Sequence, residues 1–67
     1  MSRWISVKNR LPKTGQKVLC YEKYGEVTSG VFIERYATPC FNRGGMFTQV
    51  IDGNVSHWMP LPKPPIE

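Results

Sequence analysis

The stretch KVLCYEKYGEVTSGVFIERY, residues 17–36, carries the clearest fold signal in the chain. Residues 17–23 place apolar side chains at both odd and even positions, which predicts a strand that is covered on two faces. Tyr24-Gly25 reverses the chain, because glycine tolerates positive φ, and a second strand follows over about residues 26–36. Gly30 in the middle of that strand predicts a bulge or a bend, which a small sheet needs in order to curl.

The segment before this hairpin carries shorter signals. Residues 4–7, Trp-Ile-Ser-Val, alternate briefly between apolar and polar side chains, which indicates a short strand. Residues 11–15 then predict a turn, in which Pro12 and Gly15 supply the unusual backbone angles. No window of eleven residues has the apolar spacing of a helix.

The segment after the hairpin predicts a loop and two more strands. Residues 37–45 are expected to form the loop, because they contain a proline and the pair Gly44-Gly45. A strand is predicted over residues 46–51 and another over residues 55–58. Asp52-Gly53 between them is a strong short-range signal for a hairpin.

The expected fold class is all-β, or β-rich α+β, with four to five short antiparallel strands in a small, curled, barrel-like sheet. The length of 67 residues leaves room for one domain. We place that domain at residues 1–62 and a Pro-rich C-terminal tail at residues 63–67. The proline-rich run over residues 59–65 is expected to be extended, in polyproline II form.

Composition narrows the class of protein. Hydrophobic residues make up 40% of the chain and charged residues 21%, which is ordinary globular usage. No apolar run approaches the roughly 18 residues of a membrane span, and the N-terminus lacks the apolar region of a signal peptide. These features predict a cytoplasmic protein with no membrane partner, in which both cysteines are reduced.

The search for a catalytic or metal site rests on few side chains. Cys20, Cys40 and His57 are the candidate soft metal ligands, but a structural zinc site needs four, usually in close pairs. We therefore expect no metal, no cofactor and no disulfide, with Cys20 packed in a strand and Cys40 in a loop. None of the five acidic residues has a known catalytic spacing to His57, so we expect a structural histidine that is hydrogen-bonded to backbone, and no enzymatic activity.

Trp4 and Trp58 have two interpretations. Buried, each contributes about 150–250 Å² of contact surface, which a domain of this size can hardly leave outside. Exposed, they could stack on bases or fill a pocket of a partner. We favour the core role, and expect the two termini to meet with at least one tryptophan clamping the sheet.

The basic residues also have two interpretations. The formal net charge is +4, and the one dense basic stretch runs from Lys8 to Lys17 without an acid. A solvated rim is favoured over a dedicated binding patch. The candidate binding residues are Trp4, Trp58, His57, Lys8, Arg10, Lys13 and Lys17.

Both ends of the chain carry an uncommon sequence motif. WISVKNRLP at residues 4–12 and VSHWMPLPKPP at residues 55–65 together resemble a family of proteins of unknown function, DUF551, which occurs among tailed-phage and prophage genes. Ser56 stands where the family has threonine. The resemblance spans essentially the whole chain and implies a small phage-encoded protein in the bacterial host cell, but it implies no activity and no site residue.

Two classes of function remain. We predict a non-enzymatic accessory protein, a protein-interaction module that binds a host or phage protein as a monomer or weak homodimer. The alternative is a small basic nucleic-acid-binding domain that uses aromatic and Lys/Arg side chains. Basic residues 8–17 gathered beside exposed aromatics would favour nucleic acid. An apolar patch or an open sheet edge would favour a protein partner.

Overall fold

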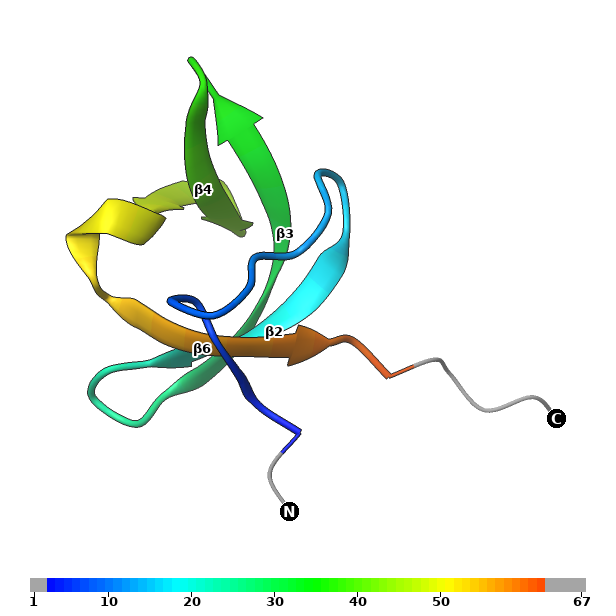
Figure 1. The fold of residues 1–67 in the computed structure, drawn as a ribbon, viewed down its shortest axis with the longest axis vertical. Helices are drawn as coiled ribbons and strands as arrows, with labels where there is room; N and C mark the ends of the chain where they lie inside the picture. Colours follow the sequence, from blue (N-terminus) through cyan, green and yellow to red (C-terminus); the bar gives the residue numbers. More distant parts are fainter. Residues whose placement is uncertain (1–2, 63–67) are drawn as a thin grey trace, which may run out of the picture.

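A computed structural model describes residues 3–62 and contains one antiparallel sheet (Figure 1). Its order is β1-β6-β2-β3-β4-β5, so β1 and β5 are the two edges. The elements are β1 (Ile5–Ser6), β2 (Lys17–Glu22), β3 (Val27–Arg35), β4 (Thr38–Arg43), β5 (Met46–Gln49), the 3-10 helix η1 (Val50–Asp52) and β6 (Val55–Pro60). The predicted all-β class is confirmed, with six strands in place of four to five. The predicted tail, residues 63–67, lies outside the described residues.

The curl of the sheet is made by the long strand β3. Its first half pairs with β2 and its second half with β4, and Val31 belongs to both ladders. Gly30 lies next to this switch. A Cβ atom there would sit 2.9 Å from the backbone oxygen of Asn42 and 3.1 Å from Cγ of Arg43. The predicted bend at Gly30 therefore has a steric reason: only hydrogen fits where β3 passes β4. In Figure 1, β3 curves between the two parts of the sheet, so that the part with β4 faces the part with β2 and β6.

The enclosed face of the curled sheet holds the core. Phe32 and Phe41 are a registered cross-strand pair whose rings meet edge to face, with centroids 5.4 Å apart. Trp58 from β6 is only 3% exposed, so its predicted core role is confirmed. The buried cluster is Val18, Cys20, Phe32, Phe41, Val55 and Trp58.

The segment between β1 and β2 covers the open side of this core. The indole Nε1 of Trp58 donates a hydrogen bond of 2.8 Å to the backbone oxygen of Arg10, and Pro12 is buried. At its far end the segment is tied to β3, because Gly15 N donates to the oxygen of Phe32 and Phe32 N donates to the oxygen of Gln16. The N-terminal motif at residues 4–12 and the C-terminal motif that begins at residue 55 thus meet in space, as expected, and β1 also pairs directly with β6.

The predicted loop over residues 37–45 is wrong, because residues 38–43 form β4. Pro39 argued against a strand, since it cannot donate to a ladder. The strand can nevertheless contain Pro39, because the neighbouring strand β5 does not extend that far. On the β5 side the ladder ends at the pair Cys40 and Gln49, so no partner residue stands opposite Pro39 there. Gly44-Gly45 form the short turn between β4 and β5 in place of the end of a long loop.

The predicted hairpin at Asp52-Gly53 is also wrong. Strand β5 pairs with β4, and strand β6 lies between β1 and β2, so the chain crosses here from one edge of the sheet to the strand beside the other edge in place of folding back on itself. Residues 50–52 form η1, and Gly53 ends it with φ of 76°. The last strand runs on to Pro60, so residues 59–60, expected in the polyproline II run over residues 59–65, belong to the sheet.

Candidate functional site

One polar cluster lies on the enclosed face of the sheet, around Arg43. Its Nη1 is 2.9 Å from Oε1 of Glu22, and the two side chains are 12% and 19% exposed. Its Nη2 donates to Oγ1 of Thr48 at 2.8 Å and its Nη1 donates to Oγ1 of Thr28 at 3.4 Å. These contacts tie β2, β3, β4 and β5 together. The donors of the guanidinium are thereby engaged within the domain, so the cluster is structural.

Sequence reasoning missed this cluster. Its signal was the alternation of β4, in which Arg43 has the same parity as the buried Phe41. With residues 37–45 assigned to a loop, that parity carried no information.

The two cysteines are free thiols buried on different strands. Burial raises the pKa of the Cys20 thiol to about 11, from an ordinary value of 9.0, and the Arg43 guanidinium opposes this shift. The Cys40 thiol donates to the backbone oxygen of Thr38 at 3.3 Å. A nucleophilic cysteine works as a thiolate, so Cys20 is held in the unreactive form at neutral pH.

His57 lies on β6 with its ring half-buried. Its Nδ1 is 2.8 Å from Oγ of Ser56, and Ser56 Oγ is 3.4 Å from the backbone oxygen of Tyr21. The ring partner is therefore a hydroxyl and not the backbone group that we predicted. No carboxylate orients the ring, and within residues 3–62 no three His, Cys, Asp or Glu side chains are grouped to hold a metal ion. The arrangement orients one ring on the surface of the sheet.

The opposite face of β1, β6, β2 and β3 points away from the core and carries a group of apolar side chains, with Ser6, Ser29 and Lys17 among them. Tyr21 stands in register with His57 on one side and with Val27 on the other, and Leu19 stands in register with Met59. We call this set, together with Trp4, the outer apolar face: Trp4, Leu19, Tyr21, Val27, His57 and Met59. The side chains of Tyr21 and Val27 are 36% and 53% exposed.

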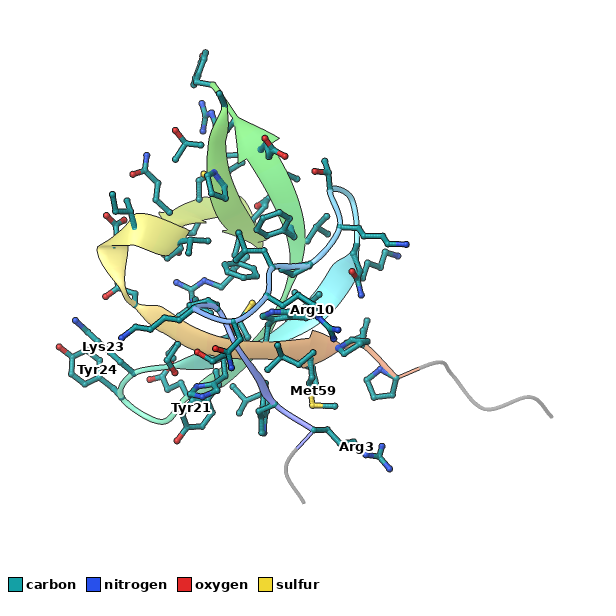
Figure 2. The ribbon with its side chains drawn as sticks, viewed as in Figure 1. Arg3, Arg10, Tyr21, Lys23, Tyr24 and Met59 are labelled. Carbon is teal, nitrogen blue, oxygen red and sulfur yellow. The ribbon has the colours of Figure 1, made fainter. Side chains whose placement is uncertain are left out.

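The rings of the outer apolar face pack on one another. The Trp4 and Tyr21 centroids are 5.6 Å apart and tilted by 57°, and Tyr21 meets His57 edge to face at 6.2 Å. Trp4 is thus half-buried on the outside of the sheet, and the core role expected for it holds for Trp58 alone. Figure 2 shows Tyr21 and Met59 on one side of β6 and β2, and Arg10 on the other.

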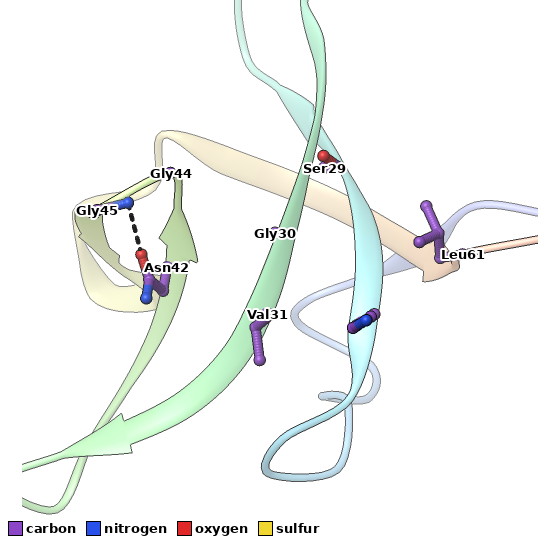
Figure 3. A pocket seen from close by; sticks show the side chains of 8 residues that line it. Ser29, Gly30, Val31, Asn42, Gly44, Gly45 and Leu61 are labelled. Carbon is purple, nitrogen blue, oxygen red and sulfur yellow. Dashed lines mark hydrogen bonds between the residues drawn. The ribbon is translucent and has the colours of Figure 1, made fainter.

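The four basic residues of the dense stretch do not gather with these aromatics. Arg10 lies over the Trp58 ring at 5.9 Å and, with Lys13, lines a hollow of about 250 Å³ on the core side. Lys8 lines a separate hollow of about 510 Å³ with Val50 and His57. Lys17 lines a third, of about 300 Å³, whose other walls Figure 3 shows: Ser29, Gly30, Val31, Asn42, Gly44, Gly45 and Leu61. The basic stretch, whose alternative interpretation was a binding patch, is therefore divided among three places.

Other charged and aromatic side chains flank the outer apolar face. Arg3 is exposed next to Trp4 and extends from the same side of the sheet as Met59 (Figure 2). At the turn after β2, Lys23 Nζ lies 5.1 Å above the ring of Tyr24, which is 85% exposed. Within the described part of the chain no helix is long and apolar enough to span a membrane.

Comparison with known proteins gives two matches to this chain. A family model described as "Protein of unknown function (DUF551)" matches residues 3–66. An uncharacterized 7.8 kDa protein from the ral-gp17 intergenic region of Salmonella phage P22 is 35% identical over 65 residues, which cover 96% of this chain and 97% of the phage protein. No solved structure matches significantly.

Proposed function

Since the chain belongs to the phage-associated DUF551 family of proteins of unknown function, we propose that it is a non-enzymatic accessory protein that binds a protein partner inside the bacterial host cell. The binding site in this proposal is the outer apolar face. The observation that carries it is that a domain of 67 residues places two tryptophans on opposite faces of one sheet, and only Trp58 is used for the core. The protein acts as a monomer or weak homodimer, and its chemistry is recognition without a cofactor.

A contiguous exposed apolar patch on a small protein often marks an interaction surface, whereas single exposed apolar residues do not. Tyr21 and Val27 are accessible at the centre and margin of the face, and Trp4 lies beside Tyr21. Aromatic residues of this kind, held in place by their neighbours, are the common anchors of protein interfaces. The basic side chains of Arg3 and Lys23 at its rim favour an acidic partner surface.

Nucleic acid is the second candidate, and the same rim favours it. The arrangement of the rings argues against it. Bases stack on open, flat ring faces, whereas the rings of Trp4, Tyr21 and His57 are tilted against each other. Arg10 and Lys13 also lie away from this face, whereas Lys8 shares a hollow with His57 at its margin. Arg3, Lys8, Lys17 and Lys23 are then the remaining basic contacts, which limits the log–log salt dependence of single-strand binding to a slope of about −3.

The test is capture of partners from the bacterial host with the intact protein and two variants. The first variant, Tyr21→Thr with Val27→Thr, removes exposed apolar surface and keeps residues that favour strands. The matched control, Tyr24→Thr, removes a ring that is more exposed but lies at the turn, outside the outer apolar face.

We expect a protein that survives nuclease treatment, is lost with the double variant and is retained with Tyr24→Thr. The proposal fails if the double variant captures the same protein equally well. A partner that disappears with nuclease, together with micromolar binding of single-stranded DNA or RNA near 150 mM salt, would assign the face to nucleic acid.

A further inference from the structure

The edge strand β5 has backbone groups that no other strand of the sheet pairs. Among the strands of residues 3–62, it has β4 on one side and none on the other. The turn at residues 44–45 has φ of 65° and 94°, as a two-residue hairpin turn requires, so Arg43 and Met46 form the hydrogen-bonded pair that closes it. Because such pairs alternate along a ladder, Phe47 directs its N–H and C=O groups toward the free edge, and Gln49 directs its N–H there. The Gln49 carbonyl is at the N-cap of η1, where it accepts the first hydrogen bond of that helix.

The neighbouring hairpin supports this assignment independently. Strands β3 and β4 are joined by the two-residue turn Tyr36-Ala37, so Arg35 and Thr38 close that ladder in the same way. Even-numbered residues of β4 then bond to β3 and odd-numbered residues to β5, which is the parity that the β4–β5 turn requires. The two turns therefore predict the same hydrogen-bonding pattern for β4, and with it the same backbone groups on the free edge of β5.

An arginine without an acidic partner lies beside this edge. The guanidinium carbon of Arg35 is 4.3 Å from the ring centroid of Phe47 and 5.6 Å from that of Tyr36. The one ion pair within residues 3–62 is that of Arg43 with Glu22, so Arg35 is held by aromatic rings alone. Stacking of this kind leaves the edge of the guanidinium, with its N–H donors, available to a carboxylate. The hollow around it, of about 360 Å³, is lined by Arg35, Tyr36, Thr38, Cys40, Phe47 and Gln49.

The turn above this hollow is strained and displays a tyrosine. Tyr36 and Ala37 both have positive φ, of 52° and 62°, although neither is glycine. The Tyr36 side chain is 90% exposed. Backbone strain of this kind is concentrated at sites of function, and here it places a large ring at the tip of the hairpin, next to Arg35.

We propose that the β5 edge binds an extended peptide segment of a partner protein by strand addition, and that Arg35 recognises an acidic side chain of that segment. Main-chain hydrogen bonds to the N–H and C=O of Phe47 and to the N–H of Gln49 hold the added strand, and the hollow beside Arg35 receives every second side chain. This site lies on the β3–β4–β5 part of the sheet and is separate from the outer apolar face.

The charge around the edge identifies an acidic partner and argues against a second copy of the chain. Strand β5 reads Met-Phe-Thr-Gln and carries no acid, and the net charge of the chain is +4. Pairing of two β5 edges would bring like-charged domains and their Arg35 side chains together. Strand β5 contains neither lysine nor proline, the residues that often protect a free edge against pairing, so its edge is open to an added strand.

The structure supplies a specific variant for the test. Gln49 has φ of −71°, close to the value that proline imposes, and the preceding Thr48 is in a strand. Gln49→Pro therefore removes the N–H at the free edge while the backbone stays in place. Gln49→Ala is the matched control, because it changes the side chain and keeps the N–H. Arg35→Gln and Arg35→Lys separate loss of the charge from loss of the planar donor group.

The probe is a labelled eight-residue peptide in which valine alternates with glutamate, paired with one in which lysine replaces glutamate. Binding to the whole protein is followed by fluorescence anisotropy and by amide chemical shifts. We expect the glutamate peptide to bind at least tenfold more tightly than the lysine peptide and to shift the Phe47 and Gln49 amides. Gln49→Pro and Arg35→Gln should each weaken binding at least fivefold, whereas Gln49→Ala should bind like the wild type.

The proposal is overturned if Gln49→Pro, folded by its amide spectrum, binds as tightly as Gln49→Ala, or if the lysine peptide binds equally well. Shifts centred on Tyr21 and Val27 would also overturn it, because they would move the peptide to the outer apolar face. Concentration-dependent shifts of Phe47 and Gln49 without peptide would assign the edge to a second copy and refute an acidic partner.

Discussion

Replacing Gly30 by alanine tests the curl of the sheet, on which every surface described above depends. The added Cβ would lie 2.9 Å from the Asn42 backbone oxygen, whereas ordinary contacts begin at 3.4 Å, so β4 must move by about 0.5 Å. Overpacking against a closely packed neighbour costs about 1–3 kcal/mol. Alanine recovers about 0.4–1 kcal/mol by restricting the unfolded chain. We expect a net loss of about 1–2 kcal/mol and a Tm lower by about 4–16 °C.

The measurement is thermal and urea unfolding of Gly30→Ala beside Ser29→Ala. Ser29 is the exposed neighbour on the same strand, and its truncation should change stability by less than about 0.5 kcal/mol. Gly30 does not have positive φ, so the alanine backbone is unstrained and the effect reports the contact with β4. A Gly30→Ala protein that melts at or above the wild-type temperature would refute the close passage of β3 over β4.

Four further substitutions test the core and the strained turn. Trp58→Ala should remove about 3–5 kcal/mol, nearly the whole stability of a domain this small, and leave the chain unfolded by circular dichroism, whereas Trp4→Ala should still melt cooperatively. Equal loss in both would contradict their placement on opposite faces. The raised pKa of Cys20, about 11 against 9.0, stabilises the fold fully below pH 9; this contribution is lost as the pH rises toward 11. Urea unfolding at pH 8 and 10.5 should therefore show a larger loss for the wild type than for Cys20→Val, and parallel losses would disprove the assignment. Ala37→Gly relieves a positive φ and should raise stability by about 0.5–1 kcal/mol, or the Tm by about 2–8 °C; a lower Tm would show that the turn is not left-handed.

The candidate binding residues show where prediction from the sequence stopped. Trp58 and Trp4 were both identified, but a sequence does not say which face of a strand each will occupy until the strand has neighbours. Lys8, Arg10, Lys13 and Lys17 are close in sequence and separate in space, because the segment between β1 and β2 crosses the core while Lys17 begins a strand. Arg35 was not identified at all, since its role depends on a ring from another strand.

Local chemistry determined the all-β class and most reversals of the chain. Gly15, Gly25 and Gly44-Gly45 have positive φ in the structure, which is the conformation that makes glycine a turn residue wherever it stands. The N- and C-terminal motifs, each with a tryptophan and a proline, also indicated correctly that the two ends meet. These features depend on residues that are adjacent in sequence, or on a pattern repeated at both ends.

Tertiary structure alone decided the order of the strands, and with it the fate of each ambiguous segment. Pro39 can lie in a strand because β5 ends before reaching it, and Asp52-Gly53 does not form a hairpin because β6 pairs with β2 across the fold. The Arg43–Glu22 pair and the open edge of β5 arise in the same way, from residues far apart in the chain. The physical reason is that a strand acquires its inner face, its outer face and its free edge only from the strands beside it.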